Sequence, residues 1–179
     1  MLALASCAQT PEQTGGIVST NPCADAVLVE LVPPARIAAI SHYSLDAGST
    51  SIPLDVAKRY RATAGTAEEV IALRPSLVLT SSFTPLATRE AYARAGLTTL
   101  VLGSPTTVAA SKAQVMEIAD AVGAPGRGRA LVARIDAAVA GAAPPTRARP
   151  AALLYIAGDL ASGGGTLLDE MMTLAGFAN

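Results

Sequence analysis

Short apolar runs alternate with helix-like runs from residue 17 onward. Predicted strands cover residues 17–20, 37–41, 77–80 and 98–102, and predicted helices cover residues 23–32, 66–73 and 84–96. The strand runs show little polar alternation, which is typical of strands covered on both faces. Strand, short loop, helix and strand in succession predict right-handed βαβ units with a mainly parallel sheet. The chain is therefore expected to be an α/β protein.

Cap and turn residues indicate where the predicted helices begin and end. Thr66 and Glu69 form the Thr-x-x-Glu pattern of a capping box, with Thr66 at the N-cap. Pro75 ends that helix, because proline has no N–H to donate within a helix. Pro85 is expected at the first position of the next helix, and Gly96 at its end. These signals support the element boundaries independently of the hydrophobic pattern.

The alternation stops after residue 102. Two helical runs, 108–122 and 127–139, follow one another with no strand-like segment between them. Residues 142–150 contain three prolines and are expected to be a linker. A further unit then begins, with a strand at 151–156, a glycine loop at 163–165 and a capped helix at 166–175. Because one strand and one helix cannot form a sheet alone, we expect the sequence to be truncated at its C-terminal end.

The composition excludes several classes of protein. Hydrophobic residues make up 51% of the chain and charged residues 15%, which excludes a disordered or low-complexity chain. The net charge is −1 and the basic residues are scattered, so no nucleic-acid partner is expected. No apolar run reaches the roughly 18 residues that a membrane-spanning helix needs. A folded α/β protein without a membrane span remains.

The N-terminus carries the pattern at which bacterial lipoproteins are cleaved and acylated. Residues 4–7 are an apolar residue, two small residues and Cys7, and a polar stretch follows. We expect a lipid anchor on Cys7, with the true start upstream because the preceding segment is too short for a signal peptide. The alternative is a chance match at an apolar terminus. Cys23 opens a helical run and is expected to be a small buried residue; a Cys7–Cys23 disulfide would require an unacylated Cys7.

Polar and aromatic residues follow three of the predicted strands. Asn21 comes after the first strand, His42 and Tyr43 after the second, and Ser82 and Phe83 after the strand at 77–80. In open parallel sheets, ligands bind beyond the carboxyl ends of the strands. The chain has four tyrosines and two phenylalanines, so two rings at strand ends predict contact with a large flat ligand. The alternative is that each ring packs beneath its own loop.

Catalytic and metal motifs are absent from the sequence. His42 is the only histidine, and no Gly-x-Ser-x-Gly or His-Glu-x-x-His pattern occurs. A protein metal cage needs several ligands, so His42 is expected to give at most one contact to a chelated metal. The glycine loop at 163–165 could cradle a phosphate at a helix N-terminus, but a plain turn is favoured. We therefore expect neither an enzyme nor a resident cofactor.

Three segments resemble one known family. They are residues 17–43 (IVSTNPCADAVLVELVPPARIAAISHY), 65–80 (GTAEEVIALRPSLVLT) and 163–179 (GGGTLLDEMMTLAGFAN). They are similar to the substrate-binding proteins of ABC importers for cobalamin and ferric siderophores, the class III periplasmic binding proteins. The strongest match is EEVIALRPSLVL, which resembles the family block E-x-I-x-A-L-K-P-D-L-V, with Ser76 where aspartate is commoner.

The resemblance implies a Rossmann-like N-terminal lobe, a long connecting helix and a second α/β lobe, with the ligand between the lobes. The chain then divides into a lipoprotein-like terminus (1–16), the first lobe (17–123), the connecting helix and linker (124–149) and an incomplete second lobe (150–179). Tyr43 matches an aromatic residue that touches ligand in cobalamin-binding members, and Ser82 and Phe83 lie where another cleft aromatic residue sits. Glu68 matches a surface glutamate that docks on the permease.

The resemblance predicts a periplasmic or cell-surface protein, anchored by lipid, that captures an iron chelate (a ferric siderophore or haem) or a corrinoid for an ABC importer. The absence of tryptophan favours an iron chelate over a corrinoid. The rival hypothesis is a nucleotide-binding, Rossmann-like enzyme domain, although the turn after the first strand lacks the glycine fingerprint. A third hypothesis is a surface receptor without its own transporter. The 179 residues alone are expected to capture ligand weakly or not at all, because one lobe cannot enclose a ligand.

Overall fold

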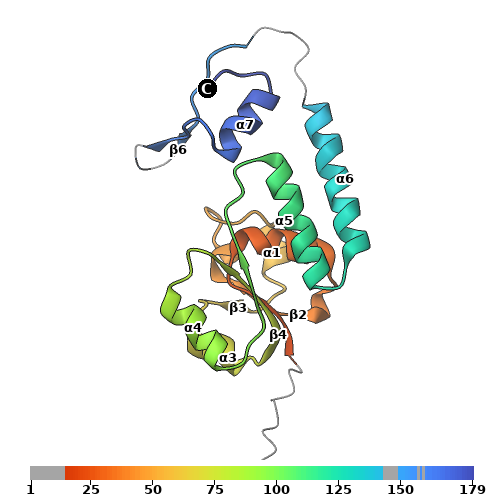
Figure 1. Cartoon of the computed structure of the whole chain (residues 1–179), viewed down its shortest axis with the longest axis vertical. Helices are drawn as coiled ribbons and strands as arrows, with labels where there is room; N and C mark the ends of the chain where they lie inside the picture. Colours follow the sequence, from red (N-terminus) through yellow and green to blue (C-terminus); the bar gives the residue numbers. More distant parts are fainter. Residues whose placement is uncertain (1–14, 143–148, 157, 159) are drawn as a thin grey trace, which may run out of the picture. The chain divides into compact units, whose positions relative to one another are not determined.

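A computed structural model describes residues 15–142, 149–156, 158 and 160–179 (Figure 1). These residues form two compact units. The first contains residues 15–26 and 33–101, and the second contains residues 27–32 and 102 onward. The division into lobes at 123 and 149 stays a prediction, and the expected lipid attachment at Cys7 lies outside the described residues.

A five-stranded sheet forms the centre of the first unit (Figure 1). Its strands are β1 (Gly15–Ser19), β2 (Ile37–Ser41), β3 (Ala62–Thr63), β4 (Pro75–Ser81) and β5 (Thr99–Leu102). Their order in the sheet is β3-β2-β1-β4-β5. The central strand β1 pairs in parallel with both β2 and β4, and β2 pairs in parallel with β3. The predicted α/β class with a mainly parallel sheet is confirmed.

The predicted helices of this region are present. They are α1 (Pro22–Leu31), α3 (Ala67–Ala72) and α4 (Leu86–Arg94); the shorter α2 (Leu54–Ala57) and the 3-10 turns η1 (Pro34–Arg36) and η2 (His42–Leu45) carry no sequence signal strong enough to predict them. Pro85 is the N-cap of α4 rather than its first residue, a shift of one position. Such a shift is within the usual uncertainty of a helix boundary.

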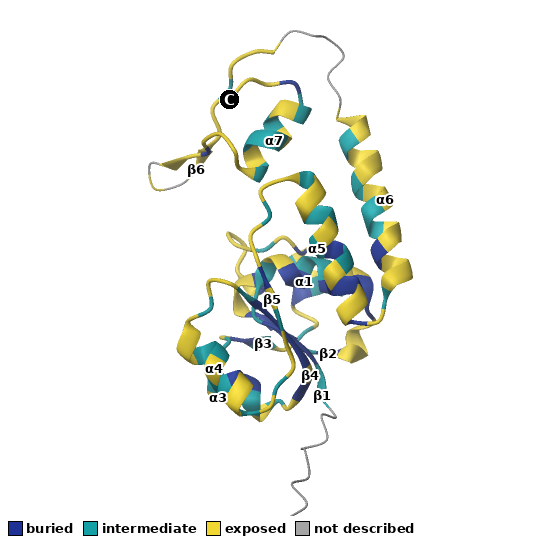
Figure 2. Ribbon diagram, viewed as in Figure 1, coloured by how far each residue is buried: buried dark blue, intermediate teal, exposed yellow. Residues whose placement is uncertain are grey.

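The core of the first unit joins the sheet to two helices. Val18, Ala39 and Val78 come from the three adjacent strands β1, β2 and β4, and they pack with Val70 of α3 and Tyr92 of α4. All five are fully buried. Figure 2 shows buried residues concentrated along the central strands. The sequence runs that lack polar alternation are therefore the central strands, as expected for a covered parallel sheet.

The start of α3 confirms half of the predicted capping box. Thr66 accepts a hydrogen bond from the Glu69 N–H at 3.3 Å, as a capping residue does. The Glu69 carboxylate does not reach back to the N-cap N–H; it accepts from the Thr63 hydroxyl and from the Ala64 N–H, both at 2.7 Å. These bonds, that from Thr63 first, lower the pKa of Glu69. The carboxylate thus holds the loop before the helix instead of the cap itself.

The prediction that Cys23 is buried is wrong. Cys23 is exposed, whereas Ala24 and Asp25, the next two residues of α1, are buried. Successive side chains on an α-helix point about 100° apart, so one residue next to a buried pair is turned toward solvent. The helix itself was predicted correctly, but the side of its first turn that faces the core was not. That side carries Asp25, a polar residue that a hydrophobic pattern does not assign to a core.

A helical hairpin dominates the second unit. It consists of α5 (Val108–Ala121) and α6 (Pro125–Gly141), which cover the two helical runs predicted at 108–122 and 127–139 to within two residues at each end. Gly128 of α6 is buried against Ala119 of α5, and a Cβ added at Gly128 would lie only 2.4 Å from the Ala119 Cβ. Arg134 bonds to Glu30 of the last turns of α1 at 2.8 Å. Helices α5 and α6 are therefore closely packed at Gly128 and Ala119.

The last described segment corrects the predicted strand at 151–156. Only β6 (Tyr155–Ile156) forms there, paired in antiparallel fashion with β7 (Leu160–Ala161), and α7 (Leu167–Leu174) follows. Ala151 makes an isolated bridge to Ala178. Extended residues form a strand only where one neighbouring strand takes up their hydrogen bonds, and residues 151–154 divide theirs between two places: the Ala152 N–H donates to the Ala178 carbonyl and the Leu154 carbonyl accepts the Ser162 N–H. Leu153 and Tyr155 are left 71% and 64% exposed.

Candidate functional site

The candidate site lies at the carboxyl edge of the sheet. Because β2, β1 and β4 are adjacent and parallel, the loops that follow them leave the sheet at the same edge. These loops carry the five predicted ligand residues, namely Asn21 after β1, His42 and Tyr43 after β2, and Ser82 and Phe83 after β4. The chain turns to opposite sides of β1, so this edge is also the topological switch point at which such sheets bind ligands.

Both aromatic rings at this edge are exposed. Tyr43, in η2, has 52% of its surface exposed, and Phe83, in the loop after β4, has 80%. The alternative that each ring packs beneath its own loop is therefore wrong. The strand ends that carry the two loops are about 10 Å apart, because two strand spacings separate β2 from β4. The edge therefore presents two exposed aromatic side chains, on loops that follow the strands on either side of β1.

His42 and Tyr43 form a ring pair. Their ring centroids are 4.1 Å apart and their planes are tilted by 35°. The His42 Nδ1 lies 3.3 Å from the carbonyl oxygen of Thr63, at the end of β3. Because a carbonyl only accepts, Nδ1 carries the hydrogen when this bond forms, and the neutral ring keeps its free electron pair on Nε2. His42 can therefore offer one nitrogen to a ligand or to a chelated metal.

Asn21 is occupied in part by helix capping. Its side-chain oxygen accepts the Cys23 N–H at 2.9 Å, and its own carbonyl accepts the Asp25 N–H at 3.0 Å. The side-chain amide N–H groups remain for a ligand acceptor. Pro22 has no N–H, and the Cys23 N–H is already bonded, so the N-terminus of α1 has fewer free donors for a phosphate. This geometry disfavours the nucleotide-binding hypothesis.

A chain of threonine hydroxyls lies at the switch point and was not predicted. The Thr20 hydroxyl donates to Thr80 at 3.2 Å, and Thr80 and Thr84 share a hydrogen bond of 2.8 Å. Arg89 of α4 donates from Nε to the Thr84 carbonyl at 3.2 Å. Threonine at a strand end is common, so the sequence alone gave no reason to single these residues out. They fix the β4–α4 loop beside Phe83 and add one positive charge there.

Glu68 is exposed in the first turn of α3. Its neighbour Glu69 is held by Thr63 and Ala64, which leaves Glu68 as the carboxylate of the first turn that faces outward. A carboxylate here is also favoured by the helix dipole. The structure therefore agrees with a surface position for Glu68, and its docking role stays a prediction.

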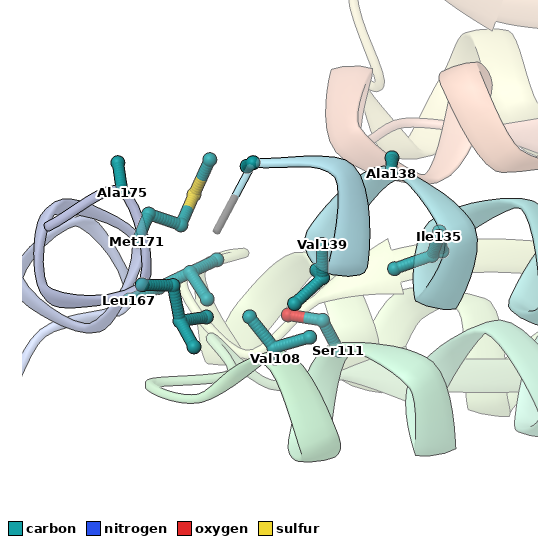
Figure 3. Close-up of a pocket in the computed structure, with 10 residues that line it drawn as sticks. Val108, Ser111, Ile135, Ala138, Val139, Leu167, Met171 and Ala175 are labelled. Atoms are coloured by element: carbon teal, nitrogen blue, oxygen red, sulfur yellow. The ribbon is translucent and has the colours of Figure 1, made fainter. Parts of the chain in front are cut away.

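A hollow lies between α5, α6 and α7 in the second unit, away from the strand-end loops in the sequence (Figure 3). It has a volume of about 400 Å³ and an apolar lining that includes Val108, Ile135, Val139, Leu167 and Met171. Neither aromatic nor charged side chains line it. Its lining includes one hydroxyl, that of Ser111, which is buried without a hydrogen-bond partner among the described residues. With no ring or charge beside that hydroxyl, the hollow is less suited to a flat or metal-bearing ligand than the strand-end site, which remains the candidate.

The glycine loop at 163–165 forms no phosphate cradle. The N–H of Gly165 donates to the Asp169 carboxylate at 2.9 Å, and Thr166 donates its hydroxyl to the Gly163 carbonyl at 3.0 Å. A side-chain carboxylate thus takes the donor that a phosphate would use. Across the described residues, no group of three or more histidine, cysteine, aspartate or glutamate side chains is placed to hold a metal ion. In the same part of the chain no helix is long and apolar enough to cross a membrane.

Comparisons with known proteins agree with this architecture. A family model described as Periplasmic binding protein matches residues 17–179. The apo form of the periplasmic heme-binding protein RhuT from Roseiflexus sp. RS-1 is similar, with a TM-score of 0.75 and 24% identity over 92% of this chain and 65% of that chain. The periplasmic heme-binding protein BhuT, in complex with two hemes, gives a TM-score of 0.68 and 27% identity over 91% of this chain and 65% of that chain.

The siderophore binding protein BauB, bound to two molecules of acinetobactin and ferric iron, gives a TM-score of 0.64 and 15% identity over 92% of this chain and 61% of that chain. A search of curated protein sequences finds no match. The chain spans 65% of the length of RhuT and BhuT. The family match covers the sheet, its strand-end loops and the helices that follow. The chain belongs to the periplasmic binding protein family.

Proposed function

We propose that the chain captures an iron chelate, haem above all, outside the cytoplasm and passes it to an ABC importer. The observation that carries this proposal is the pair of exposed rings, Tyr43 and Phe83, on either side of the central strand at the carboxyl edge. Two exposed rings carried by loops at one edge of the sheet form a surface that a flat ligand can cover at low entropic cost. The likeness to two heme-binding proteins supports the ligand class.

Each residue of the edge has a proposed part in holding the ligand. Tyr43 and Phe83 supply aromatic faces, which add contact area at low entropic cost. His42 offers Nε2 as a single contact to the chelated metal, since its Nδ1 faces the Thr63 carbonyl. Asn21 and Ser82 donate hydrogen bonds from the amide and the hydroxyl. The ligand brings its own metal, so the chain needs no metal cage.

Arg89 adds an electrostatic contribution that the sequence did not predict. Its guanidinium is held beside the β4–α4 loop through the bond from Nε to the Thr84 carbonyl. A cation fixed at the rim attracts carboxylate groups, which haem and many ferric siderophores carry. We therefore propose that an anionic side group of the ligand lies toward α4.

A panel of ligands tests the ligand class. The chain is mixed with haemin, ferrichrome, cyanocobalamin, ATP or NAD, and the melting temperature and tyrosine fluorescence are recorded. We expect haemin to raise the melting temperature and to quench tyrosine fluorescence, because it would cover Tyr43. A rise with ferrichrome or cyanocobalamin alone would move the proposal to a siderophore or a corrinoid. A rise with ATP or NAD alone would support the rival nucleotide-binding enzyme.

Two residues are proposed to serve the transport step, Glu68 and Cys7. Glu68 would dock against basic residues of the permease, and acylated Cys7 would hold the protein at the membrane surface. Glu90 is an exposed glutamate of α4 and serves as a matched control. In cells that depend on this protein for uptake, Glu68→Lys should abolish uptake and leave ligand binding unchanged, whereas Glu90→Lys should leave both unchanged. Full uptake with Glu68→Lys would refute the docking role of Glu68.

A further inference from the structure

A fully buried carboxylate lies beneath the ring pair. Asp25, in the first turn of α1, has no solvent exposure. One of its oxygens, Oδ2, accepts the backbone N–H of Ser41 at 2.9 Å and the hydroxyl of Ser44 at 2.7 Å. The other oxygen, Oδ1, accepts no hydrogen bond from the described residues. The two hydrogen bonds that Oδ2 accepts therefore both come from one short turn, while the Ser19 side chain of β1 also acts on the carboxyl and lowers its pKa.

That turn presents the two rings. Ser41 and Ser44 are buried, and the two residues between them, His42 and Tyr43, are exposed. Ser41 also accepts the Tyr43 N–H with its hydroxyl at 3.4 Å, which caps η2. The residues that flank the ring pair on both sides are thus fastened to the same carboxylate oxygen.

Hydrogen bonds to a buried carboxylate are stronger than those between neutral groups, and breaking them leaves buried donors without a partner. Burial raises the pKa of Asp25 to about 6, while the serine hydrogen bonds oppose that rise. A chain that keeps an acidic group in such a place bears a desolvation cost that an apolar residue would avoid. The contact that offsets this cost is the one with the turn.

We propose that Asp25 is a positioning residue of the ligand site, whose buried carboxylate fixes the turn that presents the His42 and Tyr43 rings. The proposal rests on the ligand role of the ring pair proposed above. Asp25 does not touch the ligand; it acts by holding Ser41 and Ser44. Its removal is expected to leave the two rings free to move and to weaken ligand binding through their placement.

Because His42 is the only histidine, its imidazole C–H signals can be followed by NMR without assignment of the other residues. The Tyr43 ring at 4.1 Å shifts these signals and gives a nuclear Overhauser effect between the two rings. In Asp25→Leu we expect the His42 signals to move toward those of an unstructured histidine and the inter-ring effect to disappear. Asp25→Asn keeps an oxygen for both serine donors and should preserve both signatures.

Asp46 provides a matched control two residues after Ser44. Its carboxylate accepts the Ser49 hydroxyl at 2.8 Å and the Gly48 N–H at 3.1 Å. Asp46 contacts η2 through its backbone N–H, which donates to the Tyr43 carbonyl at 3.2 Å and is kept in Asp46→Asn. Asp46→Asn should leave the His42 signals unchanged. A folded Asp25→Leu with unchanged His42 signals overturns the proposal. If Asp25→Leu does not fold, Ser44→Ala removes one of the two bonds without a change in bulk, and unchanged signals in that variant overturn it equally.

Haemin binding gives a second and separate measure. Where the wild-type chain binds haemin, Asp25→Leu should weaken the affinity by about tenfold, as expected when buried donors lose their acceptor, and Asp25→Asn should not. Equal affinity in Asp25→Leu and the wild type contradicts a positioning role. If the wild-type chain does not bind haemin, the proposed function fails, while the NMR result still decides whether Asp25 orders the ring pair.

Discussion

Substitution of Gly128 by alanine should destabilise the α5–α6 hairpin. The added Cβ would lie 2.4 Å from the Ala119 Cβ and 3.1 Å from the Met116 sulfur, whereas carbon atoms in contact lie about 3.5–4.0 Å apart. The helices would have to separate by more than an ångström at a seam where Ile118 is buried. Overpacking of this kind costs about 1–3 kcal/mol, and the better helix propensity of alanine returns up to about 1 kcal/mol. We expect a net loss of about 1–2 kcal/mol.

Urea unfolding followed by circular dichroism measures this loss. Gly126→Ala is the matched control, because a Cβ there meets only the tip of Arg129 at 4.0 Å. This variant should be neutral or slightly stabilised. In the double variant Gly128→Ala/Ala119→Gly the methyl group changes helix, so stability should recover part of the loss. A Gly128→Ala chain as stable as the Gly126→Ala chain would refute the close packing of α5 on α6.

Two further predictions concern buried polar groups of the first unit. Tyr92 is fully buried, and burial and the nearby Glu69 raise its pKa to about 12. Its hydroxyl donates to the Gly65 carbonyl at 2.8 Å, so Tyr92→Phe should lower the free energy of unfolding by about 1 kcal/mol. An unchanged midpoint in urea unfolding would contradict this hydrogen bond. The pKa of Asp25 is raised from 3.8 to about 6, so the folded state binds more protons than the unfolded state between these values and stability falls as the pH rises through this window. The free energy of unfolding should fall by at most about 3 kcal/mol relative to Asp25→Asn. Urea unfolding of the wild type and Asp25→Asn between roughly pH 3.5 and 7, the window of the pKa shift, measures this fall. Parallel stability profiles for the two proteins would contradict the raised pKa of Asp25.

The central strands were predicted best, because they are buried along their length and their apolar runs show it. Helix α6 was predicted from its apolar spacing and from the proline and glycine at its ends, although its apolar side chains Leu131, Ile135 and Val139 are only partly buried. The strand at 151–156 failed because its partner is not determined by local sequence; Ala151 pairs with Ala178 far along the chain. Strand β3 has two residues and gives no pattern to detect.

The candidate site was predicted in position but not in detail. Loops after parallel strands meet at one edge for topological reasons, so the proximity of the Asn21, Tyr43 and Phe83 loops follows once the strands are known. The contribution of Asp25 could not be predicted, since a carboxylate in a first helical turn is usually a solvated residue that favours the helix dipole. The misplacement of Cys23 has the same origin, because the buried phase of α1 begins on a polar residue.

The central claim is that the exposed rings of Tyr43 and Phe83 hold a haem-like chelate. The most direct measurement is a haemin titration followed at the Soret band. It compares the wild type with Tyr43→Ala and Phe83→Ala. Tyr155→Ala is the control, because Tyr155 lies outside the strand-end loops and is about as exposed as Tyr43 (64% against 52%). The two site variants should fold like the wild type, since their rings are exposed, and each should bind haemin about tenfold more weakly, as expected for loss of one aromatic contact of roughly 1.4 kcal/mol. Tyr155→Ala should bind as the wild type does. Site variants that bind haemin with wild-type affinity would contradict the account.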